Sequence, residues 1–207
     1  MFESIRIPEP DYWKAVLAGL IRPKVPIIQF VPEYRQPPSR VLRVGSGWKG
    51  IESVLADLIR RFDIGTDSCL EFGVEHGYST AALSSFFKSV TGVDTFLGDQ
   101  HTQDFRDIYE QTVSRLSPFE NIRLVRSDFR EWIKQDNNSY DLIHIDIVHT
   151  YADTFSCGLW SALHSRCTLF HDTESFPAVK RAVIEISRVT GKRFYNFKES
   201  FGLGILV

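Results

Sequence analysis

This sequence lacks paired cysteines, long apolar runs and a large excess of charge of one sign. Its three cysteines are odd in number and form no C-x-x-C pair, which favours reduced, buried thiols in a cytoplasmic protein. No apolar run is long enough to span a bilayer, and the opening residues are too polar for a signal peptide, so we expect no membrane partner. The net charge of -2 does not suggest a phosphate-backbone partner, so we expect no nucleic acid.

The composition indicates one domain with an N-terminal extension. The chain has 207 residues, 43% of them apolar, and its 16 Phe are enough for a sizeable core. We place the domain at 48–207 and the extension at 1–47, where residues 11–22 have helical apolar spacing. Prolines then interrupt an irregular arm, which could pack as cover, close over a substrate or mediate contact in a homodimer.

Strands and helices alternate from residue 69 onward, after an amphipathic helix at 50–62. This alternation is typical of an α/β fold with a mainly parallel sheet and helices on both faces. Two further strands, 193–198 and 203–207, are joined by a short turn, so we expect a seven-stranded sheet that ends in an antiparallel hairpin. The other predicted strands are 69–73, 89–94, 122–126, 140–146 and 167–171, and the helices that follow them are 78–88, 104–116, 129–135, 151–163 and 176–190.

A glycine loop follows the first of these strands. Glu71, Gly73 and Gly77 form the pattern E-x-G-x-x-x-G, and Tyr78 and Ser79 come directly after it. A strand that breaks at glycines before a helix lets the backbone approach a ligand closely, and the first N–H groups of the helix can hold an anionic part of that ligand. The loop lacks the G-x-G-x-x-G of dinucleotide folds, and we find no catalytic Tyr/Lys pair, which argues against a nicotinamide-dependent oxidoreductase.

The spelling E-x-G-x-x-x-G-Y-S and the terminal hairpin resemble class I S-adenosylmethionine-dependent methyltransferases. The catechol and macrocin O-methyltransferase-like branches are the most similar, and the resemblance covers residues 48–207. It implies a Rossmann-like enzyme fold in which the five named residues of the glycine loop bind S-adenosylmethionine. The resemblance leaves residues 1–47 unmatched.

Polar residues lie at the ends of the second and third predicted strands of the matched region. Asp94 ends the second strand, where a carboxylate suits the paired donors of the two ribose hydroxyls. Ser127 and Asp128 follow the third strand, at the position that touches adenine in the enzymes this chain resembles. Asp128 could equally be the N-cap of the next helix, and both roles are compatible.

The stretch YDLIHIDIVHTY at 140–151 resembles the family pattern D-x-I-x-I-D-G-x-H-x-Y. Asp146 matches the acidic residue at the tip of the fourth strand, and His149 matches the following His. In the fold that this chain resembles, the first and fourth strands are neighbours, so both residues are expected to face the methyl group as catalytic residues. Ile147 and Val148 replace the usual glycine and polar residue, which makes this loop more apolar.

The fifth strand ends in His171 and Asp172, which match the pair that binds a divalent metal together with Asp146 in the metal-dependent members. The resemblance thus implies Mg²⁺ or Mn²⁺ at these three residues, where a metal would lower the pKa of a bound hydroxyl while His149 takes its proton. A nitrogen from His171 suits manganese, iron or zinc better than magnesium. We interpret His144 as structural.

Several functions stay open at this stage. The leading interpretation is O-methylation of a small hydroxylated acceptor, such as a sugar, a glycoside or a natural-product intermediate. A second is an iron oxygenase, for which His149, His171 and one Asp could supply the ligands. A third is a protein that binds S-adenosylmethionine without catalysis. Fold alone does not decide the acceptor.

Overall fold

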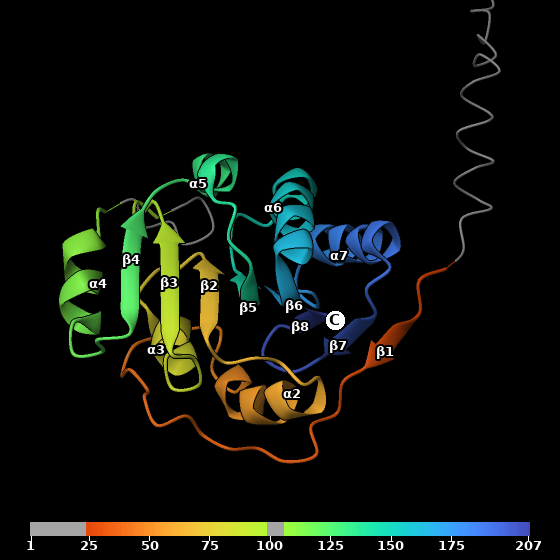
Figure 1. Ribbon diagram of the computed structural model, residues 1–207, viewed down its shortest axis with the longest axis horizontal. Coiled ribbons are helices and arrows are strands. Elements are labelled where there is room, and N and C mark those ends of the chain that lie inside the picture. The colour runs from red at the N-terminus through yellow and green to blue at the C-terminus, as the bar shows by residue number, and fades with distance from the viewer. Residues whose placement is uncertain (1–23, 99–105) are drawn as a thin grey trace, which may run out of the picture.

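The computed structural model describes residues 24–98 and 106–207, and in this part of the chain it forms one sheet of eight strands (Figure 1). The order across the sheet is β1-β7-β8-β6-β5-β2-β3-β4. The helix predicted at 11–22 lies outside the described residues, as does the start of the helix predicted at 104–116.

The central strands are parallel, as the alternating pattern predicted. They are β2 (Ser68–Phe72), β3 (Ser89–Asp94), β4 (Ile122–Arg126), β5 (Tyr140–Ile145) and β6 (Ser165–His171). The final hairpin is also confirmed, because β7 (Phe194–Phe197) and β8 (Leu203–Leu206) pair antiparallel and β8 pairs antiparallel with β6.

An eighth strand comes from the extension and was not predicted. β1 (Ile27–Gln29) pairs parallel with β7 at the edge of the sheet, and Phe30 directly after it is 1% exposed. Three exposed residues between prolines carry no alternating pattern, so sequence periodicity could not detect this strand. Residues 24–47 therefore pack on the domain that we had placed at 48–207.

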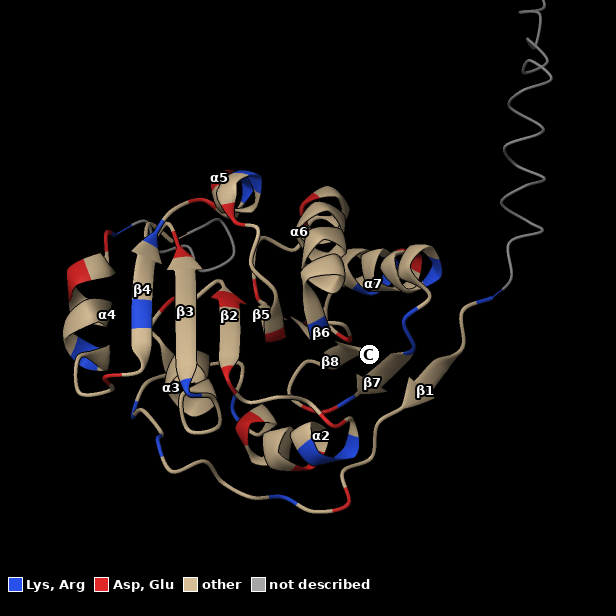
Figure 2. Ribbon diagram, viewed as in Figure 1, with Lys and Arg blue, Asp and Glu red and all other residues tan. Residues whose placement is uncertain are grey.

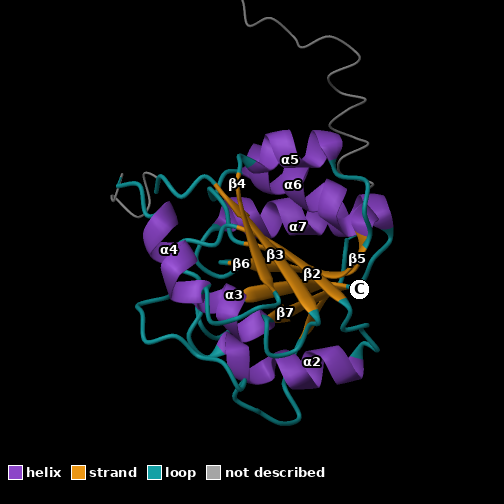
Figure 3. Ribbon diagram, turned by 60° about the vertical axis from the view of Figure 1, so that its left-hand side comes forward, coloured by secondary structure: helices purple, strands orange, loops and turns teal. Residues whose placement is uncertain are grey.

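Helices cover both faces of the sheet (Figure 3). On one face α5 (Phe129–Gln135), α6 (Tyr151–His164) and α7 (Pro177–Thr190) pack over a core that includes Phe72, Val183 and Ile186. The other face holds the 3-10 turn η1 (Ile51–Val54), α2 (Leu55–Arg61) and α3 (Tyr78–Leu83), whereas α4 (Tyr109–Leu116) lies beside β4. Both basic and acidic residues occur on α2, α4, α5 and α7 (Figure 2). Among the described residues no helix has the length and apolarity needed to cross a bilayer.

Three predicted helices differ in extent from the observed ones, and one of them is the helix predicted at 104–116, because α4 begins at Tyr109 and residues 106–108 are not helical. The helix predicted at 50–62 is divided into η1 and α2, and α3 ends at Leu83 rather than at residue 88. The Ser84 hydroxyl donates to the Ala81 carbonyl at 2.7 Å, and this local hydrogen bond competes with continuation of the helix.

The chain reverses its direction of winding between β2 and β5. β3 and β4 follow on one side of β2, whereas β5 and β6 lie on the other. Phe72 is opposite Ile145, and the Asp146 N–H donates to the Phe72 carbonyl at 2.8 Å. Ligands of open α/β sheets bind outside the carboxyl ends of the strands at such a reversal, so this is where a site is expected.

We expect Phe30→Ala to lower the free energy of unfolding by about 3–5 kcal/mol, since it removes a buried ring that contacts Phe62 and Phe197. The matched control is Val31→Ala, because Val31 is 60% exposed and its truncation should change stability by less than about 0.5 kcal/mol. Urea denaturation of both variants measures the difference. Equal stabilities would mean that the arm is not part of the folded unit.

Candidate active site

A cavity of about 570 Å³ opens at the carboxyl ends of the central strands. Its walls come from the loops after β2, β3, β4, β5 and β6, together with Ser46 and Gly47 of the arm and Phe201 of the β7–β8 turn. This volume is within the range of small-molecule sites. The lining includes ten of the twelve sequence-predicted site residues: Gly73, Tyr78, Ser79, Asp94, Ser127, Asp128, Asp146, His149, His171 and Asp172.

The two glycines of the loop have positive φ and close neighbours. Gly73 has φ +87, and a Cβ there would lie 1.7 Å from the carbonyl oxygen of Asp146. Gly77 is the N-cap of α3 with φ +82, and a Cβ there would lie 2.7 Å from Leu116 Cδ1. Glycine is therefore required at both positions, but only Gly73 lies at the cavity, whereas Gly77 packs against α4.

Asp94 is held rigidly at the cavity by backbone amides. Its Oδ2 accepts hydrogen bonds from the N–H groups of Val74 and Glu75, both at 2.8 Å, and its Oδ1 accepts one from Phe96 at 2.8 Å. A carboxylate offers about four lone-pair sites, so Oδ1 keeps capacity for a donor from a ligand. The Asp94 carboxylate thus has a fixed orientation in the wall of the cavity.

The loop after β4 is tied to Asp94. The Ser127 N–H donates to the Asp94 carbonyl at 2.9 Å. Asp128 is the N-cap of α5, where its side chain accepts from the Arg130 N–H at 2.7 Å, so the helix-capping interpretation is confirmed. Ser127 and Asp128 also line the cavity, which leaves their predicted ligand contact compatible with this geometry.

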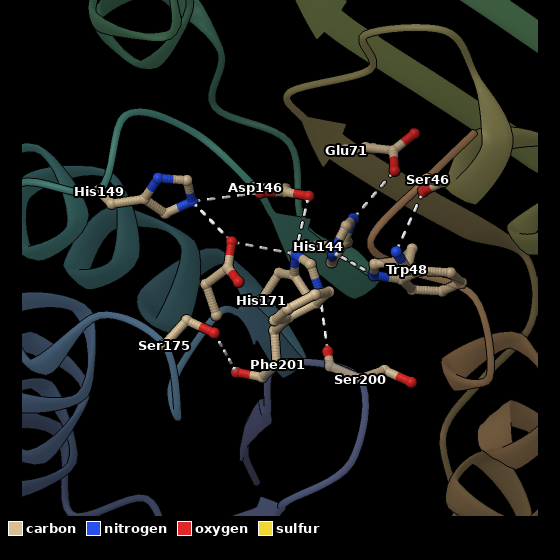
Figure 4. Close-up of polar contacts among 11 residues, drawn as sticks. Ser46, Trp48, Glu71, His144, Asp146, His149, His171, Ser175, Ser200 and Phe201 are labelled. Atoms are coloured by element: carbon tan, nitrogen blue, oxygen red, sulfur yellow. Dashed lines mark hydrogen bonds and ion pairs between the residues drawn. The ribbon is translucent and has the colours of Figure 1, made fainter. Parts of the chain in front are cut away.

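Glu71 is not brought to the cavity. It is fully buried, with Oε1 at 2.9 Å from His144 Nδ1 (Figure 4). Its Oε2 accepts a hydrogen bond from the Thr80 hydroxyl. Glu71 lies inside β2 and is paired with His144 of the neighbouring strand β5, so its carboxylate is occupied by the contact with His144. This placement does not support the predicted contact between Glu71 and a cofactor, whereas His144 has the internal position that we expected.

Two carboxylates and two imidazoles converge at the tips of β5 and β6 (Figure 4). His149 Nε2 lies 2.8 Å from Asp172 Oδ2 and 3.6 Å from Asp146 Oδ1. His171 Nδ1 lies 3.1 Å from Asp146 Oδ2 and 3.3 Å from Asp172 Oδ2. The cluster therefore joins all four residues that the sequence singled out after these strands.

Neighbouring elements orient the two imidazoles of this cluster. The His149 ring stacks on Phe176, with centroids 4.1 Å apart and planes 7° from parallel. His171 Nε2 donates to the Ser200 carbonyl at 3.2 Å, which directs Nδ1 toward the carboxylates. Asp172 has φ +66, an uncommon backbone conformation for a residue other than glycine.

The charges of the cluster compensate one another. Burial alone would lower the pKa of His149, but hydrogen bonds and attraction to Asp146 and Asp172 raise it to about 9. The same balance raises the pKa of His171 to about 10. Burial alone would raise the pKa of both carboxyls, but the two imidazoles hold them below their usual range. The raised pKa values favour protonated imidazoles at neutral pH, and His149 can serve as a proton acceptor only in its neutral form.

The most compact group of ligand atoms in this cluster differs from the predicted metal-ligand group by one residue. Asp146, His149 and Asp172 offer ligand atoms that all lie within 4.8 Å of one another. We had predicted His171 in place of His149, but His171 stands beside the group with its Nδ1 toward both carboxylates. Two oxygens and a nitrogen fit a divalent cation of the manganese, iron or zinc type better than magnesium.

Sequence reasoning missed the wall contributed by the arm and the β7–β8 turn. Gly47 faces this turn, since a Cβ there would lie 3.4 Å from the Phe201 ring and 3.5 Å from His171 Cε1. Residues 45–50 do spell G-x-G-x-x-G, but they lead into η1 and do not follow a strand, so they are not a dinucleotide fingerprint. No periodicity marks these segments, and only the fold brings them to the site.

A mainly parallel sheet with a terminal antiparallel hairpin, a glycine loop after β2 and an acidic residue at the end of β3 defines a class I S-adenosylmethionine-dependent methyltransferase fold. The family model described as a methyltransferase domain matches residues 70–173, so the chain belongs to this family and is a methyltransferase. The search of curated proteins finds no match.

Solved structures share the fold at low sequence identity. An O-methyltransferase from Bacillus cereus in complex with SAH has a TM-score of 0.55 and 14% identity, over 98% of this chain and 93% of that one. The SAM-bound amino pentose methyltransferase of calicheamicin biosynthesis from Micromonospora echinaspora has a TM-score of 0.57 and 10% identity, over 100% and 99%. Fibrillarin from Aeropyrum pernix, with natively bound S-adenosyl-L-methionine, has a TM-score of 0.50 and 13% identity, over 70% of this chain and 67% of that one.

We expect Gly73→Ala to lower the free energy of unfolding by at least about 1–3 kcal/mol, because the new methyl group meets the Asp146 carbonyl and the backbone has positive φ. The matched control is Gly45→Ala, since nothing lies within 4 Å of a Cβ there. Thermal and chemical denaturation compare the two. Equal stability of both variants would show that β2 and β5 do not approach as closely as described.

Proposed function

We propose that this methyltransferase binds S-adenosylmethionine in the cavity and transfers the methyl group to a hydroxyl oxygen of a small acceptor. One observation carries the proposal: the Asp94 carboxylate, held by three backbone N–H groups, lines the same cavity as Gly73 and the Asp146 cluster. Its rigid oxygens suit the two ribose hydroxyls of the cofactor. Ser127 and Asp128, beside Asp94, border the adenine in this arrangement.

The cofactor's methyl group then faces the carboxylate and imidazole cluster. Gly73 lies directly between Asp94 and Asp146 in the wall of the cavity, and its missing side chain lets the two halves of the site come together. The acceptor occupies the side bounded by Ile147, Val148 and Phe176, with its hydroxyl toward Asp146.

The chemistry is an in-line displacement at carbon. The acceptor oxygen attacks the methyl carbon, the carbon–sulfur bond breaks, and S-adenosylhomocysteine leaves with the electron pair of that bond. Neutral His149 accepts the hydroxyl proton, and Asp146 and Asp172 stabilise the imidazolium that results. Holding both reactants in line in a preformed cavity supplies much of the rate.

A divalent cation fits this site as an additional component. Asp146 and Asp172, with His149 or His171, would hold it, and the mixed oxygen and nitrogen donors favour Mn²⁺ over Mg²⁺. When bound, such a cation acts as a Lewis acid that acidifies and orients the acceptor hydroxyl.

The acceptor is proposed to be a small hydroxylated compound such as a sugar, a glycoside or a natural-product intermediate. Apolar and aromatic walls beside a polar cluster suit a ligand with an apolar face and hydroxyl groups at one edge. Because the fold is shared with an amino pentose methyltransferase, sugars belong in the first acceptor screen.

The cofactor is tested by isothermal titration with S-adenosylmethionine and S-adenosylhomocysteine. We expect micromolar binding of both, weakened at least about 10-fold in Asp94→Asn, since loss of a charge-assisted hydrogen bond costs about 1.5–3 kcal/mol. The control is Asp67→Asn, which changes an exposed carboxylate that pairs with Lys88. If neither compound binds the wild-type protein, the proposal is wrong.

The metal is tested by electron paramagnetic resonance of free Mn²⁺ in the presence of the protein. We expect one bound ion per chain, lost in Asp172→Asn and retained in the control Asp128→Asn, whose carboxylate caps α5. Absence of Mn²⁺ binding, with S-adenosylmethionine binding intact, would leave a metal-independent transferase. Oxygen consumption with bound Fe²⁺ would instead favour an oxygenase on this fold.

A further inference from the structure

A buried chain of hydrogen bonds lies behind the cavity and connects four segments. The Trp48 indole N–H donates to His144 Nε2 at 3.0 Å, and His144 Nδ1 contacts Glu71 Oε1 at 2.9 Å (Figure 4). The Thr80 hydroxyl donates to Glu71 Oε2. All four residues are at most 1% exposed. We call Trp48, His144, Glu71 and Thr80 the buried relay.

The donors and acceptors of the relay fix the state of His144. An indole nitrogen only donates, so His144 Nε2 must accept and carries no proton. Nδ1 then carries the proton and donates it to Glu71. The relay is fully paired only with this tautomer, and removing the indole N–H leaves a buried acceptor unsatisfied.

The relay ends close to both halves of the site without lining it. Glu71 in β2 lies two residues before Gly73, and His144 in β5 lies two residues before Asp146. These residues face each other in the register of the two strands, and the tips that follow carry the glycine loop and the metal-ligand group. The relay therefore lies within two residues of each of these two parts of the site.

Trp48 also places the arm at the cavity. Its backbone N–H donates to Ser46 Oγ at 3.1 Å, and the intervening Gly47 packs toward Phe201 and His171. The indole is 1% exposed and lies edge-on to the His144 ring, with centroids 5.1 Å apart. This one side chain holds Ser46 and Gly47 as a wall of the site.

We propose that Trp48 is a positioning residue, which acts through His144 and Glu71 to align the glycine loop after β2 with the Asp146 cluster. It also holds Ser46 and Gly47 of the arm in the wall of the cavity where the acceptor binds. The inference rests on the proposed function, because its test uses S-adenosylhomocysteine and Mn²⁺ as ligands. It assigns Glu71, whose carboxylate does not reach the cavity, a role in the alignment of the site rather than in binding.

The test compares Trp48→Phe with the matched control Trp132→Phe, which also removes an indole N–H from an acceptor, here Asp136 Oδ2 at 3.1 Å. We expect Trp48→Phe to weaken both S-adenosylhomocysteine binding, measured by calorimetry, and Mn²⁺ binding, measured by electron paramagnetic resonance, by about 5- to 30-fold each. The control should change neither. Asp94→Asn and Asp172→Asn should each affect only their own ligand, which separates positioning from direct contact.

A second measurement needs no variant and guards against misfolding of Trp48→Phe. In the ¹⁵N-labelled wild-type protein, His144 should show the Nδ1–H tautomer, and the Trp48 indole signal should shift or exchange more slowly when S-adenosylhomocysteine is added. Unchanged affinities in folded Trp48→Phe, or an indole signal that does not respond to bound S-adenosylhomocysteine, would overturn the inference. Failure of the wild-type protein to bind S-adenosylhomocysteine would instead reject the proposed function.

Discussion

The close approach of the tips of β2 and β5 is the constraint on which this site depends. The Asp146 N–H donates to the Phe72 carbonyl, and Gly73, directly after β2, has no space for a side chain against the Asp146 carbonyl. The approach joins a loop suited to a cofactor to a cluster suited to chemistry. Because it is made by backbone atoms, it is preserved only while residue 73 is glycine.

Backbone strain gathers around the same cavity. Within the described residues, six residues other than glycine have positive φ, and four of them, Glu75, Phe96, Asp172 and Phe201, line the cavity. Such conformations cost about 1–3 kcal/mol each and persist where the surroundings over-determine them. Here hydrogen bonds to Asp94 hold Glu75 and Phe96, and Glu174 and Ser175 donate to the Phe201 carbonyl.

The sequence predicted what local patterns encode. The order of strands and helices, the glycine loop and the positions of Asp94 and Asp146 follow from periodicity, from turn residues and from the geometry of parallel sheets. The partner of Glu71 did not follow, because cross-strand register decides that it meets His144. β1 and the Gly47 wall depend on tertiary packing of an arm without periodicity, and the choice between His149 and His171 depends on side-chain rotamers.

The assignments of ligand and base to the two imidazoles are linked. His149 Nε2 has one lone pair, so it either binds a cation or accepts the proton of an acceptor hydroxyl. His171 donates a hydrogen bond from Nε2 to the Ser200 carbonyl, and its Nδ1 faces the same two carboxylates. It can therefore serve as the nitrogen ligand when His149 acts as the base. The side chain of His149 is more exposed than that of His171, 13% against 5%, and it follows β5 in a loop rather than ending a strand. In the proposed reaction, His149, nearer the open side of the cavity, is the better placed base, and His171 would then complement Asp146 and Asp172 toward a cation.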